Sequence, residues 1–554
     1  METKDEHLAA IAERGSVARA SFNRMHDFPT GKRGSFSRAS FAKANLQMIP
    51  PDTTHLEMVD EVADDSIENV KTGPFVWLCA FAASIAGSLF GYDTGIISAV
   101  LVYLHTDLDN REMGTSEKEA ITSLCSAGAF VGAILAGLTA DKFGRKGAIY
   151  VGCVLFLVGA ILQAVSWSFA QMCVGRLVVG FGVGSAAMVV PLYIAELAPA
   201  NLRGRMIGLN NMSITGGQVI SYGVGAAFAN VDHGWRYMVG LGGLPAIILA
   251  CILPFCPESP RQLIWHGRRE EATRVIQRIY KHATPEQVQA KVNLIELACE
   301  ESRALNQGTS RWAIIKQLHR NPADFRALVC ACGLMVLSQL SGFNVLMYYS
   351  ATLFDLVGFS NPVAVGLVVA GGNFIMTWVN MMMVDPFGRR RLLVCTVWGM
   401  SAGLLAVAVA FSFIPINTDT LELEDRRVSA PAIVVLMSTD FFRMEVRAMG
   451  TMWMTCCNWA PNVIVSSTFL SMMKGITPSG AFGFYAAVCG IGWLLIIFFY
   501  PEVSGLTLEE THEVFQHGFG VRYARKLRKE RKDVIKARKE YEKRHGGGTM
   551  AMGH

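Results

Sequence analysis

Blocks of apolar residues alternate with short polar segments from residue 75 to residue 500. Each block holds about 20 residues, enough for a helix to cross roughly 30 Å of hydrocarbon. The blocks lack the alternation with a period of two that marks the strands of a membrane barrel. The pattern therefore predicts helical membrane spans near 75–103, 121–140, 147–167, 170–192, 206–228, 237–255, 327–350, 363–384, 392–414, 448–472 and 481–500.

One further apolar block ends too early to form a span. Residues 430–437 are apolar or Pro, and the charged residues Asp440, Arg443 and Glu445 follow them closely. Such a short helix rises only about 12 Å, far less than the hydrocarbon layer requires. Residues 415–430 are rich in charged side chains and occupy the length that a span would need. We therefore expect a tenth span that is truncated near 430–438.

Composition supports an all-α polytopic membrane protein that works in a lipid bilayer. The chain has 554 residues, of which 51% are hydrophobic and 17% are charged. Soluble domains carry about 25% charged residues. The net charge of +5 comes from basic loops and a basic tail, so no nucleic-acid partner is expected. The 13 cysteines show no metal-ligand spacing and fit small buried apolar residues, so no metal and no cofactor are predicted.

The polar segments divide the chain into five parts. Residues 1–73 form a polar tail without the apolar core of a signal peptide, and we expect it to be disordered and cytoplasmic. An N-terminal bundle of spans 1–6 at 74–256 precedes a helical linker at 257–325. Spans 7–12 at 326–502 form a C-terminal bundle, followed by a basic tail at 503–554. Basic loops mark the cytoplasmic side, so we expect both termini in the cytoplasm.

A repeat indicates that the two bundles share one architecture. Three motifs recur at an offset of 244 residues, each at the expected cytoplasmic end of a span. Transporters are commonly built from such repeats, with the substrate site between them near the middle of the membrane. The pairs are Asp141-Lys-Phe-Gly-Arg-Lys146 with Asp385-Pro-Phe-Gly-Arg-Arg390, Leu202-Arg-Gly204 with Val446-Arg-Ala448, and Pro257-Glu-Ser259 with Pro501-Glu-Val503.

Asp93 lies inside the first apolar block, where a carboxylate normally faces a cavity or a partner. Gly91 and Gly95 allow another helix to approach closely and permit a kink. We expect Arg176, near the start of the fourth span, to be the partner of Asp93. Burial raises the pKa of a carboxyl and a nearby Arg lowers it, so Asp93 could bind and release a proton during a transport cycle. Alternatively, Asp93 caps a break in the helix.

The loop at 141–146 has a spacing that basic topology signals alone do not require. Gly144 permits a tight turn between two spans. Asp141 can accept hydrogen bonds at the start of a neighbouring helix, where the helix dipole favours an anion. Arg145 can reach a carboxylate such as Glu196.

Neutral polar side chains occur inside several spans, where a single amide often joins two helices. Five amides with two aromatic residues suit a polyhydroxylated ligand, because amides donate and accept hydrogen bonds and aromatic rings cover apolar faces. We found no phosphate-binding loop, zinc-protease motif or nucleophile elbow, so an enzyme is not expected. The residues are Gln218, Gln339, Asn344, Tyr348, Asn373, Trp459 and Asn462.

Together these motifs resemble the sugar porters of the major facilitator superfamily, over residues 74 to 515. Within that family the chain is most similar to fungal myo-inositol/proton symporters, at Thr106-Asp-Leu-Asp109 and Leu346-Met-Tyr-Tyr-Ser-Ala-Thr352. The wider resemblance rests on Gly91-Tyr-Asp-Thr-Gly95, Asp141-Lys-Phe-Gly-Arg-Lys146, Pro191–Arg205, Pro257-Glu-Ser-Pro-Arg261, Gln339-Leu-Ser-Gly-Phe-Asn344 and Pro501–Glu510.

The resemblance implies a proton-coupled uptake of myo-inositol or a related polyol, by alternating access. Asp93 paired with Arg176 would be the proton-coupling acid, and the five amides with Tyr348 and Trp459 would bind the polyol. The plasma membrane is the expected location. The resemblance further implies a cytoplasmic gate, formed by Asp141, Arg145, Glu196, Arg203 and Arg205 with Asp385, Arg389 and Arg447 of the second half.

Three alternatives remain open. Ser338 stands where many sugar porters have a second Gln, which weakens a hexose assignment without removing it. The truncated tenth span and the long tails also fit a nutrient sensor that no longer transports. A non-functional splice or gene-model product is the third alternative, which sequencing of transcripts across 430–445 would test.

Overall fold

The fold was analysed in a computed structural model, which describes most of the chain between residues 72 and 529. The described residues are 67, 70, 72–199, 202–306, 319–359, 361–387, 389–413, 416–417, 422–423, 451–502, 513–516, 518–527 and 529. The predicted tail before residue 67, the truncated span at 430–438 and the gate residue Arg447 lie outside them. The side chains of Asp385 and Arg389 also lie outside what the structure describes.

The chain divides into two units by its internal contacts. One unit is Val59–Tyr500 and contains every helix of the two predicted bundles. The other unit combines Met1–Met58 with Pro501–His554. Its described residues include helical segments at 513–516 and 521–527, where the Tyr523 hydroxyl donates to Glu513 Oε1 (2.5 Å).

The first half of the larger unit is helical throughout its apolar blocks. Its elements are α4 (Pro74–Tyr103), α5 (Thr115–Ala164), α6 (Phe169–Leu197), α7 (Arg203–Ala227), α8 (Gly234–Leu241), α9 (Gly243–Ile252) and the 3₁₀ turn η1 (Leu253–Phe255). Helix α5 contains the two spans predicted at 121–140 and 147–167. They are separated at Gly144, whose φ of 80° and ψ of 166° interrupt the helix.

The predicted linker forms three helices, α10 (Pro260–Trp265), α11 (Arg269–Ile279) and α12 (Pro285–Asn306). Helix α11 buries Ala272, Val275, Ile276 and Ile279, the spacing of an amphipathic helix. The linker is also fixed to the first span. The guanidinium of Arg278 lies over the Phe75 ring at 4.0 Å.

The second half consists of α14 (Pro322–Leu340), α15 (Phe343–Leu356), α16 (Pro362–Phe387), α17 (Arg389–Ser412), α19 (Thr451–Ile476) and α20 (Pro478–Phe499). The span predicted at 327–350 is broken into α14 and α15, because Gly342 adopts a φ of 82°. Two short strands, β1 (Ile416–Asn417) and β2 (Glu422–Leu423), pair antiparallel in the polar segment after α17.

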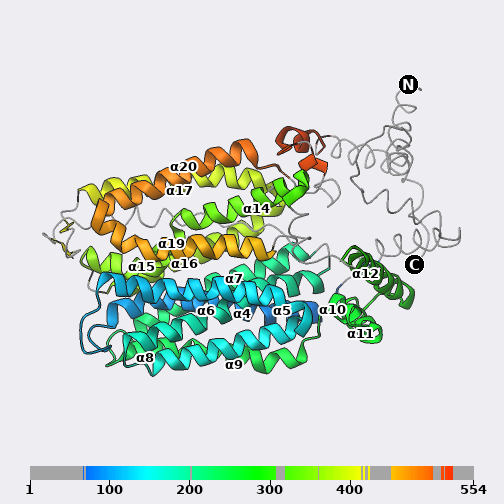
Figure 1. Ribbon diagram of the computed structural model, residues 1–554, viewed down its shortest axis with the longest axis horizontal. Coiled ribbons are helices and arrows are strands. Elements are labelled where there is room, and N and C mark those ends of the chain that lie inside the picture. The colour runs from blue at the N-terminus through cyan, green and yellow to red at the C-terminus, as the bar shows by residue number, and fades with distance from the viewer. Residues whose placement is uncertain are drawn as a thin grey trace, which may run out of the picture. The chain divides into compact units, whose positions relative to one another are not determined.

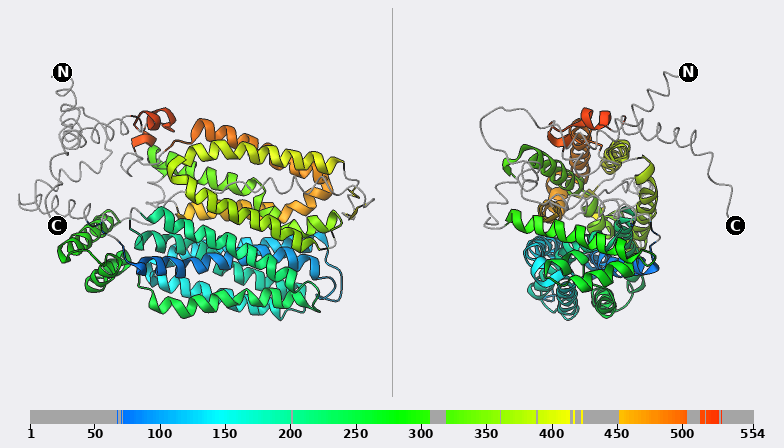
Figure 2. Two further views of the ribbon diagram at one scale, coloured as in Figure 1. Left: turned by 180° about the vertical axis from the view of Figure 1, so that it is seen from behind. Right: turned by 90° about the vertical axis from the view of Figure 1, so that its right-hand side faces the viewer.

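The two halves form two adjacent layers of helices, one with α4 to α9 and one with α14 to α20 (Figures 1 and 2). Helix α4 contacts α15, α7 contacts α16, and α5 contacts α19 across the boundary. Eight helical stretches of the described residues are long and apolar enough to cross a membrane. Helices α7 and α19 are less apolar, because they carry amides such as Gln218 and Asn462 toward this boundary.

Glycines set the distance between α4 and α7. A Cβ atom placed on Gly91 would lie 1.8 Å from the backbone oxygen of Ile214, and one on Gly95 would lie 2.0 Å from Ser221 Oγ. The close approach expected at these glycines is therefore present. The kink that they permit is not, since α4 continues as one helix to Tyr103.

We expect Gly91→Ala to lower the thermal stability of the purified protein. The added methyl group would overlap the backbone of α7, which cannot move aside as a flexible side chain can. The loss should be about 1–3 kcal/mol in the free energy of unfolding, measured by thermal denaturation in detergent.

Gly223→Ala is the matched control, because a Cβ atom at Gly223 of α7 meets nothing within 4 Å. Equal melting temperatures for the two variants would contradict the close packing of α4 against α7.

Candidate functional site

Asp93 and Arg176 form an ion pair in the middle of the first half. Asp93 lies on α4 and is 7% exposed, and Arg176 lies on α6 and is 1% exposed. Arg176 NH1 donates to Asp93 Oδ1 at 2.6 Å, and Arg176 Nε donates to the backbone oxygen of Ile121 on α5 at 3.1 Å. Two charges at this depth are tolerated because each neutralises the other.

Cys125 of α5 completes the surroundings of the carboxylate. Its thiol donates to Asp93 Oδ2 at 3.1 Å. Both oxygens of Asp93 therefore have a donor, one charged and one neutral. The second amino group of Arg176, NH2, is buried and has no hydrogen-bond partner among the described residues.

Tyr348 lies between the ion pair and the amides of the second half. Its side chain is buried beside Ser126 of α5, Asn462 of α19 and Asp93. Ser126 Oγ in turn donates to Asn462 Oδ1 at 3.1 Å. Because Ser126 follows Cys125 directly, α5 contacts both the acid and the amide cluster.

Three amides of the second half converge on a fourth, Gln339, at the break between α14 and α15. Gln339 Oε1 accepts from Asn344 Nδ2 (2.5 Å) and from Asn462 Nδ2 (3.2 Å). Gln339 Nε2 donates to Asn458 Oδ1. The break at Gly342 is what lets Gln339 and Asn344 face one another from two successive helices.

The remaining predicted ligand residues lie at the same boundary between the halves. Asn373 Nδ2 of α16 donates to Gln218 Oε1 of α7 at 2.8 Å. Trp459 of α19 is 1% exposed, and its ring meets the edge of Phe90 from α4 with centroids 5.2 Å apart. Its Nε1 is buried and has no hydrogen-bond partner among the described residues.

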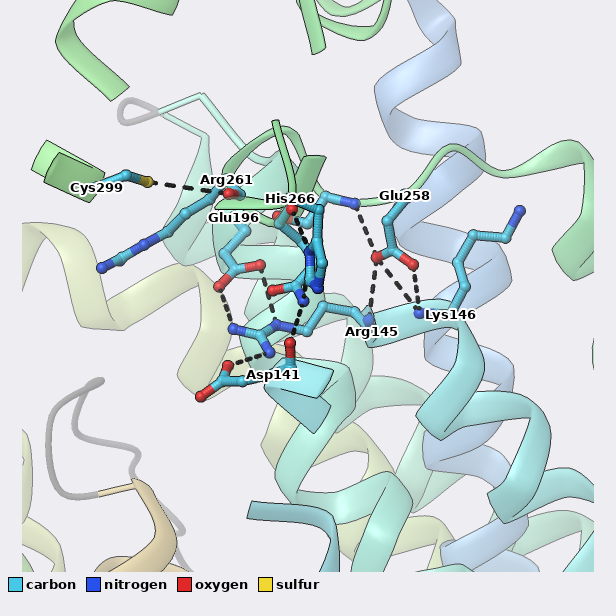
Figure 3. A network of polar contacts seen from close by, with 10 residues as sticks. Asp141, Arg145, Lys146, Glu196, Glu258, Arg261, His266 and Cys299 are labelled. Carbon is cyan, nitrogen blue, oxygen red and sulfur yellow. Dashed lines mark hydrogen bonds and ion pairs between the residues drawn. The ribbon is translucent and has the colours of Figure 1, made fainter. Parts of the chain in front are cut away.

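A second polar network surrounds the turn of α5 at Gly144 (Figure 3). Arg145 NH1 donates to Asp141 Oδ1 at 2.6 Å, and Arg145 NH2 donates to Glu196 Oε1 of α6 at 3.1 Å. Burial alone would lower the pKa of Arg145. The carboxylates of Glu196 and Asp141 outweigh burial and raise the pKa above its usual value.

Glu258, from the segment after η1, binds the start of the second part of α5. Its carboxylate accepts from the backbone N–H groups of Arg145 (3.0 Å) and Lys146 (3.2 Å). This is the helix-start position that the sequence assigned to Asp141. A Cβ atom on Gly144 would lie 2.6 Å from Glu258 Oε2, so both the positive φ and the bound carboxylate require Gly.

The structure describes the side chains of two further predicted gate residues, Arg203 and Arg205. Arg203 Nε donates to the backbone oxygen of Ala195 at 2.9 Å, beside Glu196. Arg205 is exposed.

Sequence reasoning missed the roles of Cys125, Ser126, Asn458 and Glu258. Glu258 carried a signal, since its motif recurs at the repeat offset, but the motif does not reveal which backbone groups it binds. Cys125 and Ser126 carried none, because a thiol and a hydroxyl in an apolar helix usually indicate packing.

We expect Glu258→Gln to lower the stability of the protein by about 1–3 kcal/mol, because the helix start loses a charged acceptor. Thermal denaturation of purified protein measures it. Glu271→Gln is the control, since the Arg268–Glu271 pair is exposed and should contribute under about 1 kcal/mol. A loss no larger in Glu258→Gln than in Glu271→Gln would contradict this account.

Comparison with known proteins agrees with the fold. The family model "Sugar (and other) transporter" matches residues 79–420 and 427–515, with an interruption just before the block that begins at residue 430. The structure of the xylose transporter XylE from E. coli is similar with a TM-score of 0.63 and 23% identity, covering 79% of this chain and 100% of that one. At this identity the likeness concerns the fold.

Curated relatives are more similar in sequence. Myo-inositol transporter 1 of Cryptococcus neoformans is 41% identical, over 83% of this chain and 85% of that protein. Myo-inositol transporter 1 of Saccharomyces cerevisiae is 36% identical, over 94% of this chain and 93% of that protein. The chain therefore belongs to the sugar transporter family and is an integral membrane protein with the major facilitator fold.

Proposed function

We propose that this protein takes up myo-inositol or a closely related polyol together with a proton, by alternating access of the two halves. The observation that carries the proposal is the buried Asp93–Arg176 pair beside α5, whose Cys125 bonds Asp93 and whose Ser126 bonds Asn462 of the second half. A protonatable group and a polar binding surface thus share one boundary between the halves. The names of the curated relatives support the choice of substrate.

Asp93 is the proton carrier in this proposal. A proton that binds the carboxylate neutralises it and breaks the ion pair, which leaves Arg176 anchored through Ile121 and its NH2 group free for another acceptor. When Asp93 loses the proton to the other side, the ion pair forms again. Coupling results if the two forms of the pair favour different arrangements of the halves.

The polyol is bound by groups that now bond to one another. Gln218, Gln339, Asn344, Asn373 and Asn462 present donors and acceptors from both halves, with Tyr348 beside them. Hydroxyl groups of a ring ligand can replace these bonds one for one. The ring face would lie against Trp459, whose indole N–H has capacity for one further acceptor.

The gate and the location follow from the same proposal. Asp141, Arg145 and Glu196 would close the cytoplasmic side together with Arg203 and Arg205, and Asp385, Arg389 and Arg447 would contribute from the second half. Both termini would be cytoplasmic and the membrane would be the plasma membrane.

We expect Asp93→Asn to abolish accumulation of labelled myo-inositol driven by a pH gradient, while exchange without a gradient continues. The amide cannot take up a proton in this pH range, yet it leaves the amide cluster intact. The protein is reconstituted in proteoliposomes and assayed at about pH 5.5 and about pH 7.5. Uptake measures accumulation driven by the pH gradient, and counterflow measures exchange of myo-inositol without a gradient.

Asp232→Asn, on an exposed polar residue, is the control. Asp93→Asn leaves Arg176 buried without its partner, so Asp93→Asn/Arg176→Gln serves where the single variant fails to fold. Accumulation that still followed the pH gradient in either variant would refute the coupling role of Asp93.

Trp459→Phe should raise the KM for myo-inositol by about tenfold, the effect of one lost hydrogen bond to a ligand. Its melting temperature should fall less than that of Trp235→Phe, because both variants lose the same ring volume but the Trp459 indole N–H makes no hydrogen bond to another described residue. Trp235→Phe is the comparison variant, in which stability should change and the KM should not. Trp235 Nε1 donates to Asp107 Oδ2 at 2.6 Å, so its loss should lower stability and leave KM unchanged. An unchanged KM in Trp459→Phe would exclude the indole from the binding site.

A further inference from the structure

Glu119 is a buried carboxyl group for which the proposed mechanism has no use. It lies in the second turn of α5 and is 4% exposed. Its Oε1 accepts from the backbone N–H of Ser471 at 2.8 Å, and its Oε2 accepts from the Ser471 hydroxyl at 2.6 Å. Ser471 belongs to α19 of the second half and is exposed, so this contact lies at the rim of the boundary between the halves.

The contact and the Arg145 network lie toward opposite membrane faces. Asp141 comes 22 residues after Glu119 on the same helix. At about 1.5 Å per residue that separation is roughly 33 Å, the thickness of the hydrocarbon layer. Ser126, which bonds Asn462 of the amide cluster, lies between them about 10 Å from Glu119. The Glu119–Ser471 contact therefore covers the amide cluster on the side away from Arg145.

The same two helices make both contacts. Along α5 the chain runs from Glu119 to Ser126, and along α19 the partners run in the opposite order, from Ser471 back to Asn462. Helices α5 and α19 thus lie antiparallel, and separation of the halves at this face must break the Glu119 contact. A buried carboxyl with two donors is costly to leave unpaired, which gives the closed arrangement a defined stabilisation.

We propose that the Glu119–Ser471 pair is a latch that holds the two halves closed at the membrane face opposite the Arg145 network. Its release opens the path from that face to the amide cluster. The inference rests on the proposed transport function only for the identity of the substrate, since the latch itself is defined by the contact between the halves.

Cys125 reports the opening of this path without reference to any substrate. It lies six residues beyond Glu119 on α5, is 6% exposed and bonds Asp93. The full-length protein in membranes is treated with a small, membrane-impermeant methanethiosulfonate from the Glu119 face. Mass spectrometry of the peptide that contains Cys125 then separates its labelling from that of the other cysteines.

Glu119→Ala should raise the labelling rate of Cys125 by about tenfold, because the closed arrangement loses both hydrogen bonds to a carboxyl. Ser471→Ala should raise it by about threefold, because the backbone donor remains. Glu117→Gln is the control. Glu117 lies in the first turn of α5 and pairs with Arg111 of the same half, so its loss should leave Cys125 labelling unchanged.

Kinetics provide a second readout. A larger open population at this face lowers the KM for substrate added on that side, by the same factor as the labelling rises. Equal Cys125 labelling in wild type, Glu119→Ala and Ser471→Ala would overturn the latch. If Glu119→Ala fails to fold, Ser471→Ala decides alone. Increased Cys125 labelling in the two variants would uphold the latch even if the wild-type protein took up no myo-inositol. That second result would refute the proposed substrate alone.

Discussion

The burial of one carboxylate with one guanidinium is the constraint around which the first half is built. Neither Asp93 nor Arg176 could remain charged at this depth alone, and together they fix α4 against α6 at a single register. Arg176 also bonds the backbone of Ile121, which adds α5 to the same contact. The close packing of these helices also requires small residues where their backbones meet. A Cβ atom on Gly180 of α6 would lie 2.3 Å from the Cys125 backbone oxygen of α5.

The boundary between the halves obeys the same constraint with neutral groups. No water is available in hydrocarbon to satisfy an amide, so Gln339 bonds Asn344 and Asn462, and Gln218 bonds Asn373. A ligand with many hydroxyl groups can exchange places with these bonds at little net cost. An apolar ligand or one with fewer hydroxyl groups would leave several amides unpaired, and this penalty is a physical source of selectivity.

The sequence predicted the elements that depend on one-dimensional patterns. Apolar blocks located the spans, and the rarity of charge inside them pointed to Asp93 and Arg176. The sequence was less informative about features that depend on backbone angles and on how the helices pack against one another. The break at Gly342 looked like part of one span, because a glycine inside an apolar block does not show its φ angle. Glu119 lay in a polar stretch before the second span, where nothing distinguished it from Glu117, which is only partly buried.

The two polar networks differ in what they join. Within the described residues, the contacts of Arg145 reach Asp141, Glu196 and Glu258, which all precede α14. These contacts fix the shape of the first half and its linker. The Glu119 contact, by comparison, joins the first half to the second. A gate must join both halves in one state and release them in another. A cytoplasmic gate therefore needs a partner for the Arg145 network from the second half, where the repeat supplies Asp385, Arg389 and Arg447.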